Sequence, residues 1–276
     1  MSLRRLLVRS RPRFWLYLAG PVLVGAVFGA DSVGQLLGPV PVALFAYFLL
    51  PANLFLYGVN DIFDAAVDRE NPKKKGRETR YSGDALTRWS TLGAAILGVA
   101  LLALVPADTV PWLLGFFILG AGYSAPPLRL KTRPPFDSLT NGLYVLPGVA
   151  TYAALAGTAP PAFAVVGGWL WTMGMHTFSA IPDIGPDRRA GIQTTATRLG
   201  QRLATVYCGL VWLLAAASFG LVDTRLGLLF LVYPALLALI EVADVAVDRA
   251  YWWYPAVNSL AGMVLTLGGL WGLLYG

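Results

Sequence analysis

The stretch Asn60-Asp61-Ile62-Phe63-Asp64-Ala65-Ala66-Val67-Asp68 follows a long apolar run, residues 40–59, and precedes a strongly basic segment. If the run continues through it as a helix, Asp61, Asp64 and Asp68 are spaced by three and four residues and share one face. Carboxylates held this closely repel one another unless a cation binds them. The stretch therefore predicts a divalent-metal site at the end of a helix.

A second acidic pair, Asp183 and Asp187, also ends an apolar run, again with a spacing of four. Pro182 and Pro186 predict irregular backbone here, which membrane proteins tolerate where it lines a cavity. We expect the two acidic motifs to meet around divalent metal. A ligand set rich in carboxylates and poor in His and Cys favours Mg²⁺ over Zn²⁺.

The composition is that of an all-α integral membrane protein. Hydrophobic residues make up 57% of the chain and charged residues 13%, with a mean hydropathy of +0.62, whereas soluble domains carry about 25% charged residues. A transmembrane helix needs about 17 to 25 apolar residues. The sequence predicts nine such helices, bundled together, or eight if the short fourth one does not span: 14–30, 40–60, 90–106, 110–125, 138–156, 161–181, 204–222, 225–243 and 255–275.

The net charge of +6 indicates membrane topology rather than nucleic-acid binding. If the N-terminus is cytoplasmic, all 21 Lys and Arg residues except Arg225 fall on the cytoplasmic side. This distribution follows the positive-inside rule. It predicts a multi-pass protein of the cell membrane, in contact with the lipid bilayer, with both acidic motifs toward the cytoplasm.

Two basic loops lie on the same predicted side. One contains Lys74 and Arg77, and either anchors the chain to lipid headgroups or grips an anion. The other, residues 123–135, holds Arg129 and Lys131 between four prolines, which predicts an extended loop. It could serve as an anchor, but a preformed diphosphate clamp explains its rigidity better.

The acidic motifs also indicate a weak internal repeat. Asp64 and Asp68 are each followed about 120 residues later by Asp183 and Asp187, which suggests related segments of about 40–130 and 160–250 within one domain, 1–276. Asp244 and Asp248 repeat the spacing, as a further part of the site or as an ordinary polar helix end. His176, seven residues before Asp183, is either a packing residue or a chemical one.

These motifs resemble the UbiA-type family of intramembrane prenyltransferases. The resemblance rests on Asn60 to Asp68, Asp183 to Asp187 and the loop Tyr123 to Lys131, and extends over most of the chain. It implies a helical bundle around a central cavity that opens to lipid. It implies that two Mg²⁺, held by Asp61, Asp64, Asp68, Asp183 and Asp187, bind the diphosphate of an allylic prenyl donor. Further donor contacts would come from Asn53, Asn60, Lys74, Arg77, Arg129, Lys131 and Arg188, with Tyr123 at the cation or a diphosphate oxygen.

Residues 175–183 and 123–127 look most like the lycopene elongase branch, whose members add a C5 unit from dimethylallyl diphosphate to the ends of lycopene, leading to C50 carotenoids. A polyene acceptor needs no base before the new bond forms, but a proton must then leave, and His176 or a carboxylate could take it. An aromatic quinone precursor, chlorophyllide or a glyceryl ether is the alternative acceptor. Outside the family, a divalent-cation transporter or a non-catalytic scaffold remains.

Overall fold

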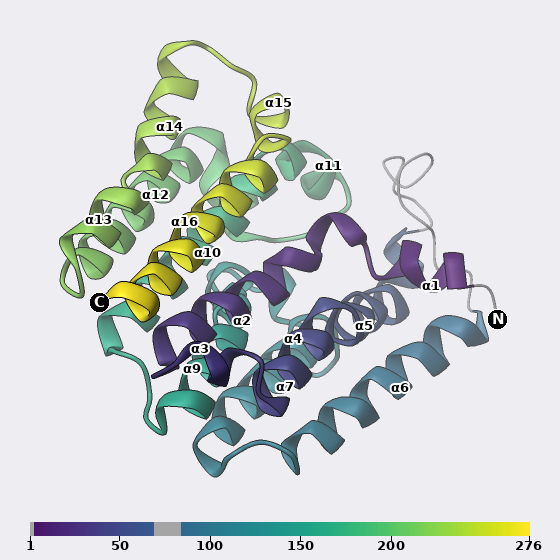
Figure 1. Cartoon of the computed structure of the whole chain (residues 1–276). Helices are drawn as coiled ribbons and strands as arrows, with labels where there is room; N and C mark the ends of the chain where they lie inside the picture. Colours follow the sequence, from purple (N-terminus) through teal and green to yellow (C-terminus); the bar gives the residue numbers. More distant parts are fainter. Residues whose placement is uncertain (1–2, 69–83) are drawn as a thin grey trace. The chain divides into compact units, whose positions relative to one another are not determined.

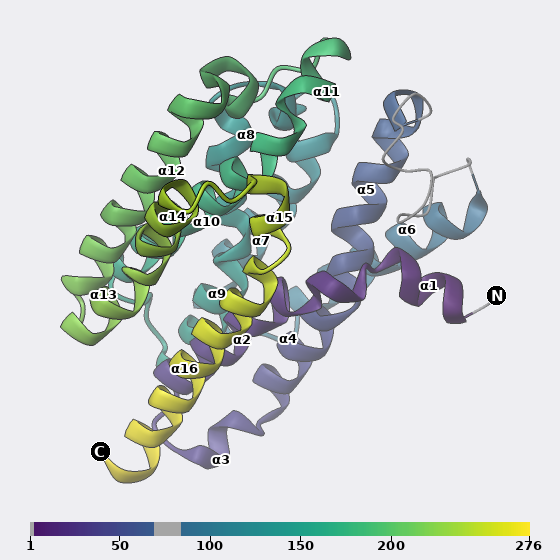
Figure 2. The same cartoon turned by 90° about the horizontal axis from the view of Figure 1, so that it is seen from above.

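The computed structural model describes the backbone of residues 3–68 and 84–276 and the side chains of 5–64 and 84–276. The described residues form helices joined by short connections, with no strand among them (Figures 1 and 2). This confirms the all-helical fold. The chain divides into two compact units, which we describe separately. The first unit is Met1–Leu128, Leu146–Thr158 and Val264–Gly276, and the second is Arg129–Val145 and Ala159–Met263.

The first unit is built from helices that carry the first acidic motif. These are α1 (Leu3–Arg9), η1 (Pro12–Phe14), α2 (Trp15–Gly29), α3 (Val33–Leu36), α4 (Pro39–Leu49), α5 (Pro51–Asp68), α6 (Ala85–Leu102), η3 (Ala107–Thr109), α7 (Val110–Ser124) and α9 (Leu146–Ala156). Both cartoons show α5 and α6 side by side (Figures 1 and 2).

The predicted span 40–60 is two helices, α4 and α5, that meet at Leu50. Pro51 explains the break, because proline disfavours helical backbone in the residue before it. The buried side chain of Asn53 closes the junction: its Nδ2 donates to the carbonyl oxygens of Phe48, at 3.0 Å, and Leu49, at 3.1 Å. A polar side chain thus stabilises the broken backbone inside an apolar segment.

Close helix packing in the first unit depends on glycine. A Cβ atom added to Gly25 of α2 would collide with the backbone of Gly148 in α9, and one added to Gly29 would meet the backbone of Tyr152. Gly25 and Gly29 form the G-x-x-x-G spacing that lets membrane helices approach closely. These glycines bring the backbones of α2 and α9 together without intervening side chains.

The second unit carries the second acidic motif. Its helices are η4 (Leu130–Thr132), α8 (Phe136–Leu139), η5 (Thr140–Tyr144), α10 (Ala162–Ala180), η6 (Ile181–Asp183), α11 (Ile184–Arg189), α12 (Thr195–Gly220), α13 (Thr224–Phe230), α14 (Val232–Val242) and α15 (Val247–Tyr251). The last helix, α16 (Tyr254–Tyr275), begins in this unit and ends in the first.

Aromatic rings of α12 fill the core of the second unit. Trp212 is fully buried, and a Cβ on Gly174 of α10 would collide with its ring. The Trp212 indole N–H donates to the Trp171 carbonyl oxygen at 3.1 Å, and its ring stacks on Tyr254 with centroids 5.8 Å apart. The small residues of α10 therefore allow α12 to pack along it and position the end of α10, from which the second motif continues.

Six stretches of the described chain are long and apolar enough to cross a membrane. They are Pro12–Gly29, Pro39–Asp64, Ala85–Leu102, Thr195–Gly220, Thr224–Val242 and Val247–Tyr275. Each corresponds to a predicted span. Of the other three predicted spans, α7 and α9 are short, with 15 and 11 residues, and α10 has 19 residues but lower hydropathy. The nine-span count and the cytoplasmic N-terminus stay predictions.

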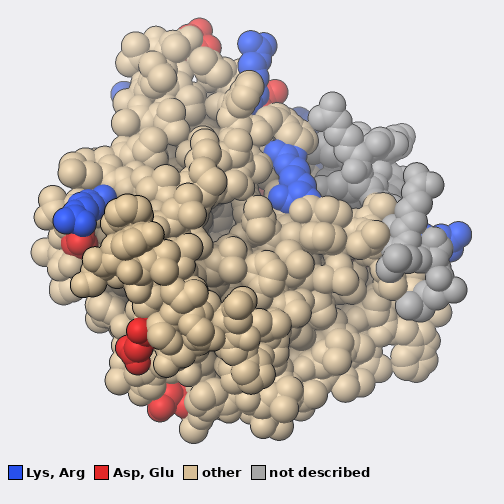
Figure 3. All heavy atoms as spheres, in the orientation of Figure 1, with Lys and Arg blue, Asp and Glu red and all other residues tan. Residues whose placement is uncertain are grey.

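Apolar side chains are widely exposed in the described residues. Val242 is 86% exposed, Leu37 80% and Trp271 67%. On the face drawn in Figure 3, charged side chains are few and lie between broad uncharged areas. Such surfaces are unfavourable in water and suit a hydrocarbon environment, which agrees with a multi-pass membrane protein.

Candidate functional site

The first acidic motif lies on α5, as the spacing of its carboxylates predicts. Asp61 is buried, with 7% of its surface exposed, and Asp64 is half-buried. Their separation of three residues on one α-helix places both on one face. The backbone of Asp68 continues the helix, but its side chain lies outside the described residues.

Arg11 contacts this motif and was not among the predicted site residues. Its guanidinium Nη2 lies 3.3 Å from Asp61 Oδ1 and its Cζ lies 4.4 Å from the centroid of the Tyr57 ring. Arg11 has a left-handed backbone, with φ of 50°, in the turn between α1 and η1. In the sequence Arg11 counts only as a topology charge, because nothing in the local pattern separates it from the four other N-terminal arginines.

Asn60 joins the motif to the end of α7. The Ser124 hydroxyl donates to Asn60 Oδ1 at 3.0 Å, so Asn60 and the residue after Tyr123 are brought together within the first unit. Tyr123 itself is half-buried. The side-chain NH2 of Asn53 bonds to backbone carbonyl oxygens at the junction between α4 and α5. Its predicted contact with the prenyl diphosphate stays a prediction.

Of the predicted basic residues, Lys74 and Arg77 lie outside the described residues. Arg129 and Lys131 are half-buried at η4 of the second unit, where Arg129 has a left-handed backbone with φ of 43°. The expected extended loop therefore contains a turn of 3-10 helix, which tightens the chain between the prolines.

The second acidic motif is more regular than predicted. Asp183 ends η6, and Asp187 lies on α11, both half-buried. The irregular backbone expected from Pro182 and Pro186 was wrong, because both prolines lie in the first turn of a helix. Backbone N–H groups there have no intrahelical acceptor, so proline is tolerated.

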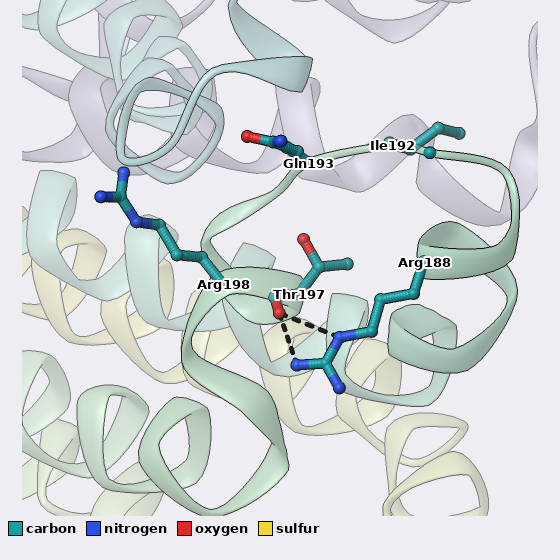
Figure 4. Close-up of a pocket in the computed structure, with 6 residues that line it drawn as sticks. Arg188, Ile192, Gln193, Thr197 and Arg198 are labelled. Carbon is teal, nitrogen blue, oxygen red and sulfur yellow. Dashed lines mark hydrogen bonds between the residues drawn. The ribbon is translucent and has the colours of Figure 1, made fainter.

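Arg188 binds the backbone of α12. Its Nε and Nη2 donate to the Thr197 carbonyl oxygen at 3.2 and 2.7 Å (Figure 4). Gly200 interrupts the helix three residues later, with φ of 76°. The guanidinium thus holds the second acidic motif against the kinked start of α12, and its predicted diphosphate contact stays a prediction.

A hollow of about 440 Å³ lies beside this contact, lined by Arg188, Gly191, Ile192, Gln193, Thr197 and Arg198. In Figure 4, Arg198 points away from Arg188 on the other side of Thr197. Two guanidinium groups at one opening make its rim cationic.

Three further predicted residues, His176, Asp244 and Asp248, differ in exposure. His176 of α10 is half-buried, and its Nε2 lies 3.7 Å from Oδ2 of Asp137, a fully buried acid that was not among the predicted site residues. Asp244 and Asp248 are exposed, and Asp248 Oδ1 accepts the N–H of Arg249. Asp137 stands just before the predicted span 138–156, and a charge next to an apolar run was the available signal.

Within the described part of either unit, no three His, Cys, Asp or Glu side chains gather closely enough to hold a metal ion. The predicted ligand set draws on both units and includes Asp68, so its convergence on metal stays a prediction.

A model of the UbiA prenyltransferase family matches residues 18–251. The chain belongs to this family. It is therefore a prenyltransferase, and the transporter and scaffold alternatives lose their support. A family member from Halobacterium salinarum, named lycopene elongase/hydratase, is 62% identical over 276 residues, 99% of each chain. One of the same name from Haloferax volcanii is 59% identical over 98% of this chain and 90% of its own.

The fold is also that of UbiA proteins. The structure of a UbiA homologue from Archaeoglobus fulgidus, bound to DMAPP and Mg²⁺, superimposes with a TM-score of 0.71. The alignment covers 96% of this chain and 98% of that one, at 18% identity. At that identity the likeness establishes the UbiA fold.

Proposed function

We propose that this UbiA prenyltransferase transfers a C5 unit from dimethylallyl diphosphate to the ends of lycopene. The observation that carries the proposal is the 62% identity, over nearly the whole of both chains, to a protein named lycopene elongase/hydratase. Agreement over the full length includes the regions that must bind the acceptor, and not only the acidic motifs.

The reaction is proposed to depend on Mg²⁺, and the donor groups of this chain fit that ion. The Asp61 carboxylate already lies next to positive charge, the Arg11 guanidinium. The single thiol of the chain, Cys208, is buried in the second unit and belongs to neither acidic motif. The acidic motifs offer oxygen ligands, which hard divalent ions prefer. Two ions would be held by Asp61, Asp64, Asp68, Asp183 and Asp187. When bound, Mg²⁺ supplies positive charge to the departing diphosphate oxygens.

The chain's own residues complete the donor site in this proposal. Cationic side chains bind the diphosphate and stabilise its charge as the C–O bond breaks; they are Lys74, Arg77, Arg129, Lys131 and Arg188. Asn53 and Asn60 orient the diphosphate, and Tyr123 contacts it or the allylic cation. Apolar walls exclude water, which would otherwise capture that cation.

The test uses membranes containing the chain, labelled dimethylallyl or geranylgeranyl diphosphate, and added lycopene. We expect label in the carotenoid fraction only with the C5 donor and Mg²⁺, and none after chelation of divalent ions. The relatives' name includes hydratase, so products should be separated into hydroxylated and non-hydroxylated carotenoids. Label in a quinone precursor, chlorophyllide or glyceryl ether would overturn the lycopene assignment and identify the alternative acceptor.

A further inference from the structure

Asp137 is a buried carboxylate that the donor chemistry leaves unused. Only 1% of its surface is exposed, and it lies on α8, directly after the proline-rich loop. A carboxylate removed from water is costly unless hydrogen bonds and an opposite charge compensate it. Its partners therefore indicate what it is for.

One side of Asp137 is fixed by the start of α12. Oδ2 accepts the Thr195 backbone N–H at 2.8 Å, and Oδ1 accepts the Thr195 hydroxyl. The helix has its own capping box, in which Thr194 and Thr197 satisfy each other's backbone N–H groups. The start of α12 is therefore capped without Asp137. The two hydrogen bonds from Thr195 hold the Asp137 carboxylate in one orientation.

The other side of Asp137 faces His176. Asp137 Oδ2 lies 3.7 Å from His176 Nε2, close enough for the carboxylate charge to act on that ring nitrogen. A carboxylate next to one ring nitrogen favours the proton on that nitrogen and leaves the lone pair on the other. Asp137 therefore favours the His176 tautomer that has its hydrogen on Nε2 and its lone pair on Nδ1.

Hydroxyl groups hold the elements that carry this pair. Thr177, next to His176, donates to Ser138 Oγ at 3.0 Å, and Ser138, next to Asp137, shares a hydrogen bond of 3.0 Å with the Tyr207 hydroxyl of α12. The pair is therefore fixed by three elements, α8, α10 and α12. Such support is what a group of defined orientation needs.

We propose that His176 accepts the proton released in prenyl transfer and that Asp137 is its positioning residue. The inference rests on the proposed function. The donor C–O bond breaks, and its electron pair leaves with diphosphate. The acceptor π electrons form the new C–C bond and leave a carbocation. A neighbouring C–H bond then supplies the electrons of a new double bond, and its proton passes to His176 Nδ1.

Where water adds instead, its oxygen bonds to the carbocation and its surplus proton passes to the same nitrogen. In both routes Asp137 balances the imidazolium charge. The aspartates of the two acidic motifs suit this step less, because a carboxylate stabilised by a bound cation is a weaker base.

The test is Asp137→Asn, compared with Thr172→Val. Asparagine keeps the size, and its oxygen can replace Oδ2 as the acceptor of the Thr195 backbone N–H. It carries no negative charge, so it no longer balances the charge of the imidazolium. We expect kcat to fall about 100-fold or more, as for loss of a general base, with unchanged KM for the donor and unchanged thermal stability. Thr172→Val removes a buried hydroxyl of the same helix, α10, whose hydrogen bond goes to the Trp169 carbonyl oxygen, and it should retain kcat within about 3-fold.

Two further measurements distinguish a role of Asp137 and His176 in proton removal from a role in donor ionisation. Metal-dependent release of diphosphate from the donor without acceptor should survive in Asp137→Asn, because it precedes proton loss. An acceptor deuterated at the position that loses hydrogen should give a single alkene with the native chain and a mixture with the variant. Native kcat in Asp137→Asn, loss of diphosphate release in parallel with turnover, or an equal loss in Thr172→Val would each overturn the inference.

Failure of the lycopene assignment can be distinguished from failure of the Asp137–His176 inference. Transfer to any neutral acceptor releases one proton, so the comparison is made with whichever acceptor takes the label. An acceptor other than lycopene would overturn the proposed function and leave the pair standing if Asp137→Asn still lost kcat. Native kcat in Asp137→Asn would overturn the pair and leave the acceptor assignment unchanged.

Discussion

The aspartate side chains of this protein have different roles although their chemistry is the same. Asp61 lies beside Arg11, Asp137 is held by Thr195, and Asp84 caps α6. Burial separates them: Asp61 and Asp137 are buried, whereas Asp84 is half-buried. A buried carboxylate must be compensated by its neighbours, so its partners report its role better than its position in the sequence does.

Asp64→Ala tests the proposed metal ligands at the residue scale. Loss of one ligand should lower turnover at least about 100-fold and raise the Mg²⁺ concentration that half-restores it, with unchanged thermal stability. The matched control is Asp108→Ala, an exposed acid of η3 in the same unit, which should retain native activity. A variant with native Mg²⁺ dependence would remove Asp64 from the ligand set.

Asp84 provides a prediction for pH dependence. Partial burial raises the pKa of Asp84, but the hydrogen bond and charge of Arg9, at 2.6 Å, and the Thr87 hydrogen bonds outweigh this and leave the pKa below its usual value. The charged form therefore binds more strongly in the folded state. Its contribution to the free energy of unfolding is present at neutral pH and is lost as the pH falls below about 3.9 and through the lowered pKa.

Asp84→Asn isolates this effect, because asparagine also caps helices well. At neutral pH the variant should lose no more than about 1 kcal/mol, the usual value of an exposed ion pair. Thermal unfolding in detergent at pH 7 and at acidic pH measures the difference. A gap between native and variant that stays constant down to acidic pH would show that the charge of Asp84 contributes nothing.

At the scale of elements, glycine decides which helices lie close. Gly25 allows backbone contact between α2 and α9, and Gly174 makes room for Trp212 between α10 and α12. Proline decides where helices end, as at Pro51, but not where it stands in a first turn, as at Pro186. The same residue type therefore breaks one predicted span and leaves the second acidic motif helical.

Gly25→Ala should destabilise the protein by about 1–3 kcal/mol, the typical cost of overpacking, because the added methyl group meets backbone that cannot turn away. Gly20→Ala is the matched control on the same helix, since a methyl group added there would meet no atom within 4 Å. Alanine favours helix over glycine, so this control should be neutral or more stable by up to about 1 kcal/mol. Equal melting temperatures for the two variants would contradict the close approach of α2 and α9.

For the whole molecule, the predicted order of spans places alternate connections on opposite sides of the membrane. Cys208 is fully buried, so a Cys208→Ser chain is a suitable background for single new cysteines. Asp108→Cys and Asp223→Cys should react with an impermeant maleimide in intact cells, whereas Arg133→Cys should react only after permeabilisation. All three native side chains are exposed. Labelling of Arg133→Cys from outside would overturn the cytoplasmic assignment of the site.

The sequence by itself determined the helical membrane fold, the helical face of Asp61 and Asp64, and the UbiA family. These depend on apolar length, on the spacing of three and four residues, and on motifs that are local in the chain. The tertiary structure decided which distant partners those residues meet. Arg11 and Asp61 are 50 residues apart, and Asp137 and Thr195 are 58 apart. Such pairs form only when helices pack, because no local spacing encodes which buried charge another helix will compensate.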